Sequence, residues 1–91
     1  MSPKLSRQYL IDGTFVDISI DEIRADSFRP HGVKYRFAWI ENGKCRVLFD
    51  NHPGKKDHVH IDGVEQDYQF ESVEKLFDDF AAEIRKRGGL I

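Results

Sequence analysis

The chain's most chemically versatile side chains gather between residues 51 and 61. Three of its four histidines fall there, together with two lysines and an aspartate: His52, Lys55, Lys56, Asp57, His58 and His60. His58 and His60 are two positions apart in a segment that is typical of a strand, so they point to the same side with Cα atoms about 6.5–7 Å apart. Val59 and Ile61 then face the core. We therefore expect both imidazoles on the outer side of the strand.

Such a pair suits general acid–base chemistry. Imidazoles titrate near pH 6.5, so one can accept a proton while the other donates one near neutral pH. A lysine beside them can stabilise the negative charge that develops on a phosphate. Metal-independent RNA cleavage needs this set of groups: a base for the 2′-hydroxyl, an acid for the leaving oxygen and a cation for the phosphorane.

Two other interpretations of the same stretch stay open. His52, His58 and His60 could bind a divalent transition metal, with Asp50 or Asp57 as a further ligand. His-x-His is a weak ligand signal, and the chain lacks the cysteine pairs of a structural zinc site. The plainer interpretation is a polar loop without a cofactor, whose histidines form local hydrogen bonds.

Basic and aromatic side chains precede the histidines. They comprise Lys34, Tyr35, Arg36, Trp39, Lys44 and Arg46. As a group they could hold an RNA backbone, with Trp39 or Tyr35 as a stacking surface. Taken singly, each cation is more simply the solvated side of a strand, and Arg46 then lies over Trp39 in a cation–π contact.

Alternating hydrophobicity and turn dipeptides predict the elements that position these residues. The expected strands are Gln8–Ile11, Thr14–Ile23, Val33–Glu41, Lys44–Asp50 and His58–Asp62, followed by an extended Tyr68–Phe70. Ser72 is a good helix N-cap, and an apolar stripe runs from Val73 to Ile84 before Gly88-Gly89 ends the helix. The sequence therefore predicts an α+β fold: a small antiparallel meander of about five strands with one C-terminal amphipathic helix packed on it.

The Asn42-Gly43 dipeptide is the strongest hairpin signal in the chain. If these two residues form the turn, Glu41 pairs with Lys44. Tyr35, Phe37 and Trp39 then share a face with Arg46 and Leu48, whereas Ala38 and Ile40 share the other with Cys45, Val47 and Phe49. With these apolar neighbours, Cys45 is expected in the core.

Size and composition limit the classes of protein. The 91 residues, of which 40% are hydrophobic and 33% charged, predict one globular domain spanning 1–91. A single cysteine gives no internal disulfide. With no hydrophobic leader and no apolar run of about 20 residues, we expect a cytoplasmic protein without a membrane span. The net charge of −2 argues against a general nucleic-acid coat.

Several motifs in order along the chain carry a resemblance to a known family. They are Lys34-Tyr35-Arg36-Phe37, Phe49-Asp50-Asn51, Gly54-Lys55, Asp57-His58-Val59-His60, Asp62-Gly63-Val64-Glu65, Tyr68, Phe70, Ser72-Val73-Glu74, Leu76 and Asp79-Phe80. The pattern resembles the TumE-type toxin family of bacterial toxin–antitoxin systems. The resemblance implies a helix-turn-helix antitoxin as partner and a target in RNA or translation. Lys56 departs from the pattern, because a small residue is expected after the lysine.

The resemblance and the residue chemistry together give a working assignment: a toxin that acts on RNA or translation as a metal-independent ribonuclease. The catalytic candidates are His58, His60, Lys55 and Asp57, and the substrate-binding candidates are Arg36, Arg46, Lys56, Asn51 and Trp39. A non-catalytic interaction module that binds a partner through its exposed sheet face or edge is the main alternative. A histidine-cluster metal-binding domain is another, and a homodimer is compatible with all three.

Overall fold

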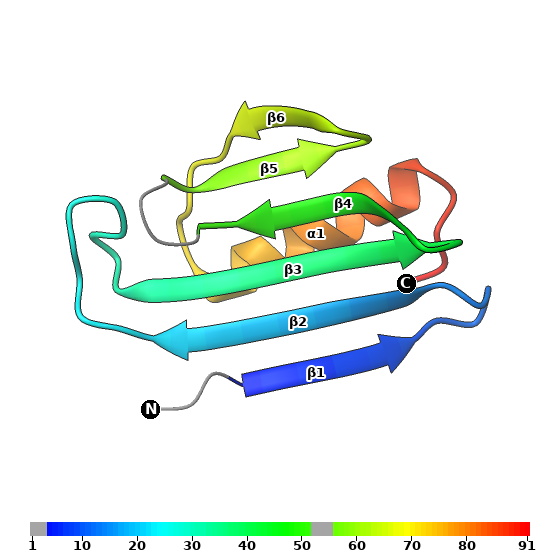
Figure 1. Cartoon of the computed structure of the whole chain (residues 1–91), viewed down its shortest axis with the longest axis horizontal. Coiled ribbons are helices and arrows are strands. Elements are labelled where there is room, and N and C mark those ends of the chain that lie inside the picture. Colours follow the sequence, from blue (N-terminus) through cyan, green and yellow to red (C-terminus); the bar gives the residue numbers. More distant parts are fainter. Residues whose placement is uncertain (1–3, 52–55) are drawn as a thin grey trace.

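The computed structural model describes residues 4–51 and 56–91, and it contains one sheet and one helix (Figure 1). The elements are β1 (Lys4–Tyr9), β2 (Phe15–Glu22), β3 (Val33–Glu41), β4 (Lys44–Asp50), β5 (His58–Ile61), β6 (Val64–Asp67) and α1 (Val73–Lys86). The strands form an antiparallel meander in the order β1-β2-β3-β4-β5-β6. The α+β prediction is confirmed, with six strands where about five were expected.

Two tight turns build the second half of the sheet. Asn42 and Gly43 have φ values of 51° and 76°, and Asp62 and Gly63 have 48° and 86°. Positive φ at both central residues gives the turn whose twist matches paired strands. The first turn confirms the hairpin prediction. The second leads into β6, which the sequence did not reveal because all its residues are exposed and show no alternation.

The first strand differs from the prediction. Gln8–Ile11 was expected, whereas β1 covers Lys4–Tyr9 and pairs with β2 up to Tyr9↔Phe15. The turn after it is broader than a two-residue hairpin, because the Leu10 N–H donates to the Thr14 carbonyl at 2.8 Å. An edge strand packs on one side only, so its hydrophobic pattern is weak.

A β-bulge changes the register between β3 and β4. Ile40 pairs with Cys45, but Trp39 pairs with Val47, so β4 carries one extra residue at Arg46. Val47 therefore lies on the same side as Trp39, and Leu48 lies on the opposite side. Phe49 pairs with Phe37 and belongs to the core. The expected faces of Val47, Leu48 and Phe49 were wrong for this reason. Cys45 is exposed and is not part of the core.

Helix α1 covers one face of the sheet. The Ser72 hydroxyl accepts a hydrogen bond from the Lys75 N–H at 3.1 Å, which confirms the predicted N-cap. The helix buries three side chains against the sheet: Leu76, Phe80 and Ile84. Phe80 meets the edges of aromatic rings from β3 and β4 with centroid distances of 5.5 Å to Phe37 and 6.1 Å to Phe49.

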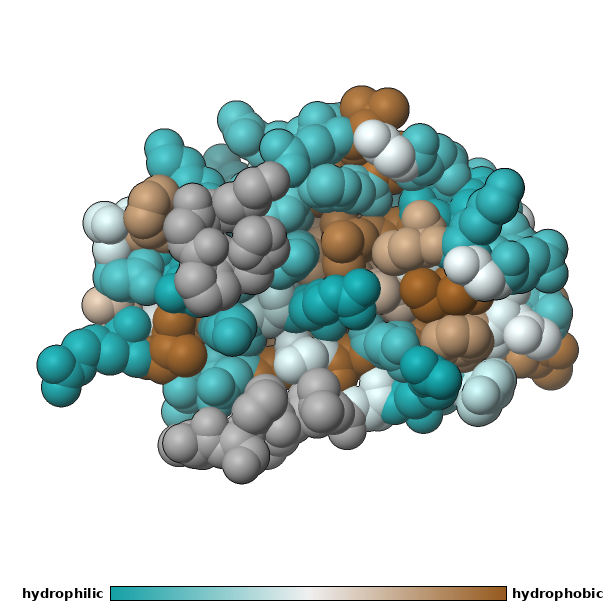
Figure 2. All heavy atoms as spheres, in the orientation of Figure 1, coloured by the Kyte–Doolittle hydropathy of each residue, from teal (hydrophilic) through white to brown (hydrophobic). Residues whose placement is uncertain are grey.

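The other face of the sheet has no helix from residues 4–51 or 56–91 over it. It is turned toward the reader in Figure 1, where α1 lies behind the strands. We call it the open face. Figure 2 shows hydrophilic residues over much of it, with apolar side chains gathered over the right half of β3 and β4. Strand alternation places Ile40 and Leu48 on this face. No helix in the described part of the chain has the length and apolar character needed to cross a membrane.

Candidate functional site

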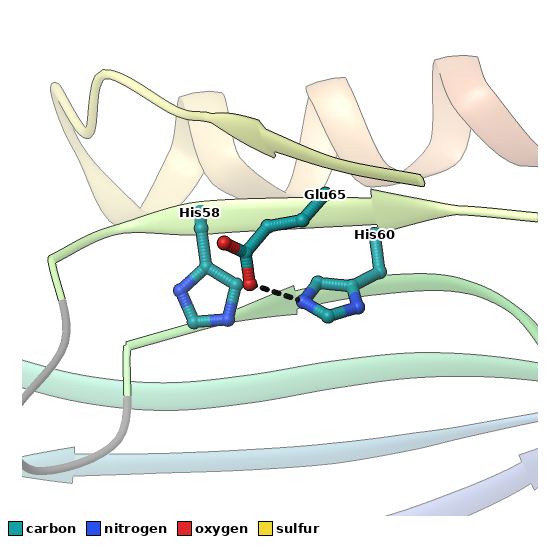
Figure 3. Close-up of side chains that lie close together, drawn as sticks. All are labelled: His58, His60 and Glu65. Carbon is teal, nitrogen blue, oxygen red and sulfur yellow. Dashed lines mark hydrogen bonds and ion pairs between the residues drawn. The ribbon is translucent and has the colours of Figure 1, made fainter. Parts of the chain in front are cut away.

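The candidate site lies on the open face, where β5 presents two histidines. Val59 is 6% exposed and belongs to the core, and Ile61 packs against that core. Because successive side chains of a strand alternate between faces, His58 and His60 both project from the open face. This confirms the predicted direction of the two imidazoles. Figure 3 shows them with Glu65, which reaches toward them from β6.

The two rings are close and differently buried. Their centroids are 5.1 Å apart, with an angle of 56° between the planes. His58 is buried, whereas the His60 side chain is 35% exposed.

Backbone and side-chain contacts orient each ring. His58 Nδ1 lies 2.8 Å from the Lys56 carbonyl oxygen. A carbonyl only accepts, so Nδ1 carries a proton, and in the neutral ring Nε2 holds the lone pair. His60 Nε2 lies 2.9 Å from Glu65 Oε1. His60 and Glu65 are direct partners across β5 and β6, so the sheet itself sets this contact.

A row of charged residues leads away from the histidines across the sheet. His58 pairs with Asp50, and Asp50 pairs with Arg36. Asp50 is buried, whereas Arg36 is exposed. Direct cross-strand partners have Cβ atoms about 4.5–5.5 Å apart. The predicted substrate-binding residue Arg36 therefore lies on the same face as the imidazoles, two strands from β5.

A hollow of about 730 Å³ opens beside this row. Its lining includes the cationic side chains Arg7, Lys34 and Arg36, together with Asp50. Arg7 is already paired, because its Nε and Nη2 atoms donate to Asp17 at 2.7 and 2.9 Å. That pairing lowers the pKa of Asp17. Lys34 and Arg36 are both exposed at the hollow.

Asp57 does not join the histidines. Its carboxylate accepts hydrogen bonds from the Tyr35 hydroxyl at 2.7 Å and from Asn51 Nδ2 at 3.0 Å, and it lies 3.0 Å from His31 Nε2. Tyr35 belongs to the core on the helix side of the sheet. Burial, with the bond to Asp57 second, raises the pKa of the Tyr35 hydroxyl. Asp57 therefore holds the loop end in place from the face opposite His58.

Asn51 and His31 complete this polar cluster, which we call the Asp57 clasp (His31, Tyr35, Asn51 and Asp57). Asn51 is fully buried, accepts from the Tyr35 N–H at 2.9 Å and donates to the Val33 carbonyl at 2.8 Å. His31 Nδ1 accepts from the Val33 N–H at 3.2 Å, so the Nε2 proton faces Asp57. The expected substrate-binding role of Asn51 does not fit its complete burial.

The sequence analysis did not single out His31. Its bond to Asp57 spans 26 positions, and its ring packs 4.1 Å from the Phe70 ring. Local sequence patterns do not predict contacts between residues so far apart in the chain. The only signal in the sequence was that His31 and Asp57 both lie near turns, which is true of many unrelated side chains.

Trp39 and Arg46 differ in how far they are exposed on the sheet. Trp39 is fully buried and its indole N–H donates to Thr14 Oγ1 at 3.0 Å. Arg46 Nε donates to Asp62 Oδ1 at 2.5 Å, and its Nη1 donates to Glu41. The Arg46 guanidinium lies 5.4 Å from the Trp39 ring centroid, as the cation–π interpretation predicted. The complete burial of Trp39 does not fit a stacking surface. The Arg46 side chain is 28% exposed, and its role in substrate binding stays a prediction.

The remaining candidates lie in or next to the loop between β4 and β5. His52 and Lys55 fall outside the described residues. Lys56 is exposed at the end of that loop. Glu65, which the predicted metal set did not include, stands beside His58 and His60: the potential ligand atoms of these three lie within 4.8 Å of one another.

Comparison with known proteins identifies one family. The family model for "Toxin TumE" matches residues 3–88, which is nearly the whole chain. No curated protein and no solved structure matches the chain.

Proposed function

Because the chain belongs to the TumE toxin family and is therefore the toxin component of a toxin–antitoxin system, we propose that it acts on RNA as a metal-independent ribonuclease. The observation that carries this proposal is the His58–His60 pair on the open face, with ring centroids 5.1 Å apart. The pair offers two proton-transfer groups on the face of the sheet that α1 leaves uncovered (Figure 1). On that face the His60 side chain is 35% exposed and His58 is buried beside it.

The proposed reaction is an internal transfer at one phosphate. His58 Nε2 takes the proton of the ribose 2′-hydroxyl, and the 2′-oxygen forms a bond to phosphorus. The bond from phosphorus to the 5′-oxygen breaks, and protonated His60 gives its proton to that oxygen. The products are a 2′,3′-cyclic phosphate and a 5′-hydroxyl. The Lys56 carbonyl and Glu65 orient the two rings.

Cations must bind the substrate and stabilise the phosphorane. Arg36 and Lys34 are exposed at the hollow beside the site, where the third cation, Arg7, is paired with Asp17. Lys56 is exposed at the loop end. We assign the RNA backbone to Arg36 and Lys34, and the reacting phosphate to Lys56 with Lys55. Asp57 is reassigned from a catalytic residue to a positioning residue, because its carboxylate belongs to the Asp57 clasp.

The partner completes the proposal. A toxin of this kind implies an antitoxin, and we propose that it carries a helix-turn-helix DNA-binding domain. With RNA as its substrate, we propose that the protein acts in the cytoplasm.

The test compares the wild type with two variants, each expressed without an antitoxin in a bacterium. We expect the wild type to arrest growth and fragment RNA, and the His58→Ala, His60→Ala double variant to do neither. Gln66→Ala is the matched control, because Gln66 is an exposed residue of the same hairpin and pairs with Val59 on the opposite face. It should behave like the wild type. The purified protein should also cleave RNA in EDTA and leave 2′,3′-cyclic phosphate ends.

Three results would overturn the proposal. Arrest by both the wild type and the double variant with intact RNA would leave a toxin that acts through other residues. Cleavage abolished by EDTA and restored by a metal would remove the metal-independent mechanism. The absence of arrest by a folded, expressed wild type would favour the interaction module.

A further inference from the structure

We propose that His58, His60 and Glu65 form a binding site for a zinc-type divalent transition metal ion, and that the bound ion inhibits the acid–base pair. The binding part stands on the geometry of the three side chains. The inhibition part rests on the proposed ribonuclease function.

The three side chains converge from one rigid hairpin. His58 and His60 lie at alternate positions of β5, and Glu65 is the direct cross-strand partner of His60 on β6. The Asp62-Gly63 turn fixes the register between the two strands. Figure 3 shows the Glu65 carboxylate between the two imidazoles. Because sheet pairing holds all three backbones, little ordering is needed when an ion binds.

The spacing is close to that of a tetrahedral site. The potential ligand atoms lie within 4.8 Å of one another, and His60 Nε2 is already 2.9 Å from Glu65 Oε1. Bonds of about 2.0–2.2 Å in tetrahedral geometry place ligand atoms roughly 3.4 Å apart. Side-chain rotations that move the ligand atoms by about 1 Å, without backbone movement, would bring the three atoms to that spacing.

The surroundings of His58 prepare it as a ligand. Its Nδ1 donates to the Lys56 carbonyl at 2.8 Å, which leaves Nε2 as the coordinating atom. Metal-binding histidines generally donate their second ring N–H to a carbonyl or carboxylate, which fixes the tautomer and the ring orientation. The contact with Lys56 fits this pattern.

The ligand chemistry selects the class of metal. Two imidazoles and one carboxylate are the protein ligands of a known class of zinc sites with an open fourth position. Imidazole suits zinc, copper and nickel, whereas magnesium and calcium prefer oxygen ligands. We therefore expect Zn²⁺ to bind and Mg²⁺ not to compete with it.

Binding of the metal ion and proton transfer to the substrate use the same nitrogen atoms of the two imidazoles. An ion on His58 Nε2 occupies the atom that would take the 2′-hydroxyl proton, and an ion on His60 blocks the donor of the second proton. One bound ion per chain should therefore stop cleavage, and EDTA should restore it.

The experiment measures binding to the full chain directly. Isothermal titration of the wild type with Zn²⁺ should give one ion per chain, unchanged by excess Mg²⁺. We expect His58→Ala, His60→Ala and Glu65→Gln each to weaken binding by about tenfold or more. Glu74→Gln should bind as the wild type does; Glu74 is an exposed carboxylate on α1 and controls for general charge.

The outcomes separate this inference from the proposed function. The absence of Zn²⁺ binding, or equal binding by the wild type and Glu65→Gln, overturns the site. Loss of binding in His52→Ala with retention in Glu65→Gln would replace it with the three-histidine set. RNA cleavage without zinc binding leaves the ribonuclease standing alone, and zinc binding without cleavage leaves the metal site standing alone. Cleavage unaffected by a bound stoichiometric ion overturns the inhibition.

Discussion

At the scale of single residues, the side chains with the strongest sequence signal divide between two tasks. His58 and His60 face the open surface, whereas Asp57, one position earlier, faces the core side and joins Tyr35 and Asn51. The alternation of a strand separates neighbours in this way. A motif of adjacent polar residues can thus combine residues for chemistry with residues that hold the backbone.

Asp57→Ala tests the structural task. The substitution leaves the buried donors of Tyr35 and Asn51 without their acceptor, so we expect the free energy of unfolding to fall by about 3 kcal/mol. Urea unfolding followed by circular dichroism measures this change. Asp78→Ala, an exposed helical carboxylate, is the control and should change stability by about 0.5 kcal/mol or less. Unchanged stability with lost RNA cleavage would instead return Asp57 to the catalytic group.

At the scale of elements, the sequence predicted what local signals determine. Asn42-Gly43 specified a turn because both residues accept positive φ, and Ser72 specified the start of α1 because its hydroxyl caps the Lys75 N–H. The register beyond the turn was not determined in this way. Val47 and Leu48 are both apolar, so hydrophobicity alone accepts either residue on the core side.

A matched pair of substitutions tests the bulge. Val47 is fully buried under α1, whereas Leu48 lies on the open face. Val47→Asp puts a carboxylate into the core and should lower stability by about 3 kcal/mol or more, while Leu48→Asp should cost about 1 kcal/mol or less. Thermal unfolding of the two variants measures the difference. A regular hairpin without the bulge would reverse the order, so greater damage from Leu48→Asp would contradict the observed register.

At the scale of the whole molecule, the meander and its helix could be predicted, but the contacts between distant segments could not. The direction of His58 and His60 followed from alternation within one strand. Glu65 was missed because its approach depends on β6, which has no buried residue to mark it. His31 was missed because its partner Asp57 is brought near by the fold. The residue types and their spacing thus indicated His58 and His60, whereas Glu65 joins them only through the pairing of β5 with β6.

A further set of long-range contacts, centred on Asp12, makes the stability of the fold depend on pH. The Trp39 indole donates to Thr14 Oγ1 at 3.0 Å, and the Thr14 hydroxyl donates to Asp12 Oδ1 at 2.6 Å. The Leu90 N–H, 78 positions away, also donates to Asp12, at 3.3 Å. Hydrogen bonds from the Thr14 hydroxyl and then its backbone N–H lower the pKa of Asp12 below its ordinary value of 3.8. The charged carboxylate therefore connects the first turn, the core tryptophan and the C-terminal segment.

The sign of the effect follows from this direction. A group whose pKa is lower in the folded state stabilises the fold above its unfolded pKa, and this contribution is lost as the pH falls through the folded pKa. We expect Asp12→Ala to melt at a lower temperature than the wild type from pH 5 to 8, and the gap to narrow below about pH 4. Thermal unfolding followed by circular dichroism across this range measures the gap. In a Thr14→Val background the same substitution should have a smaller effect, because the hydroxyl that favours the charged carboxylate is gone. A gap that stays constant down to pH 2, or one equally large without the hydroxyl, would show that the Asp12 charge does not carry this connection.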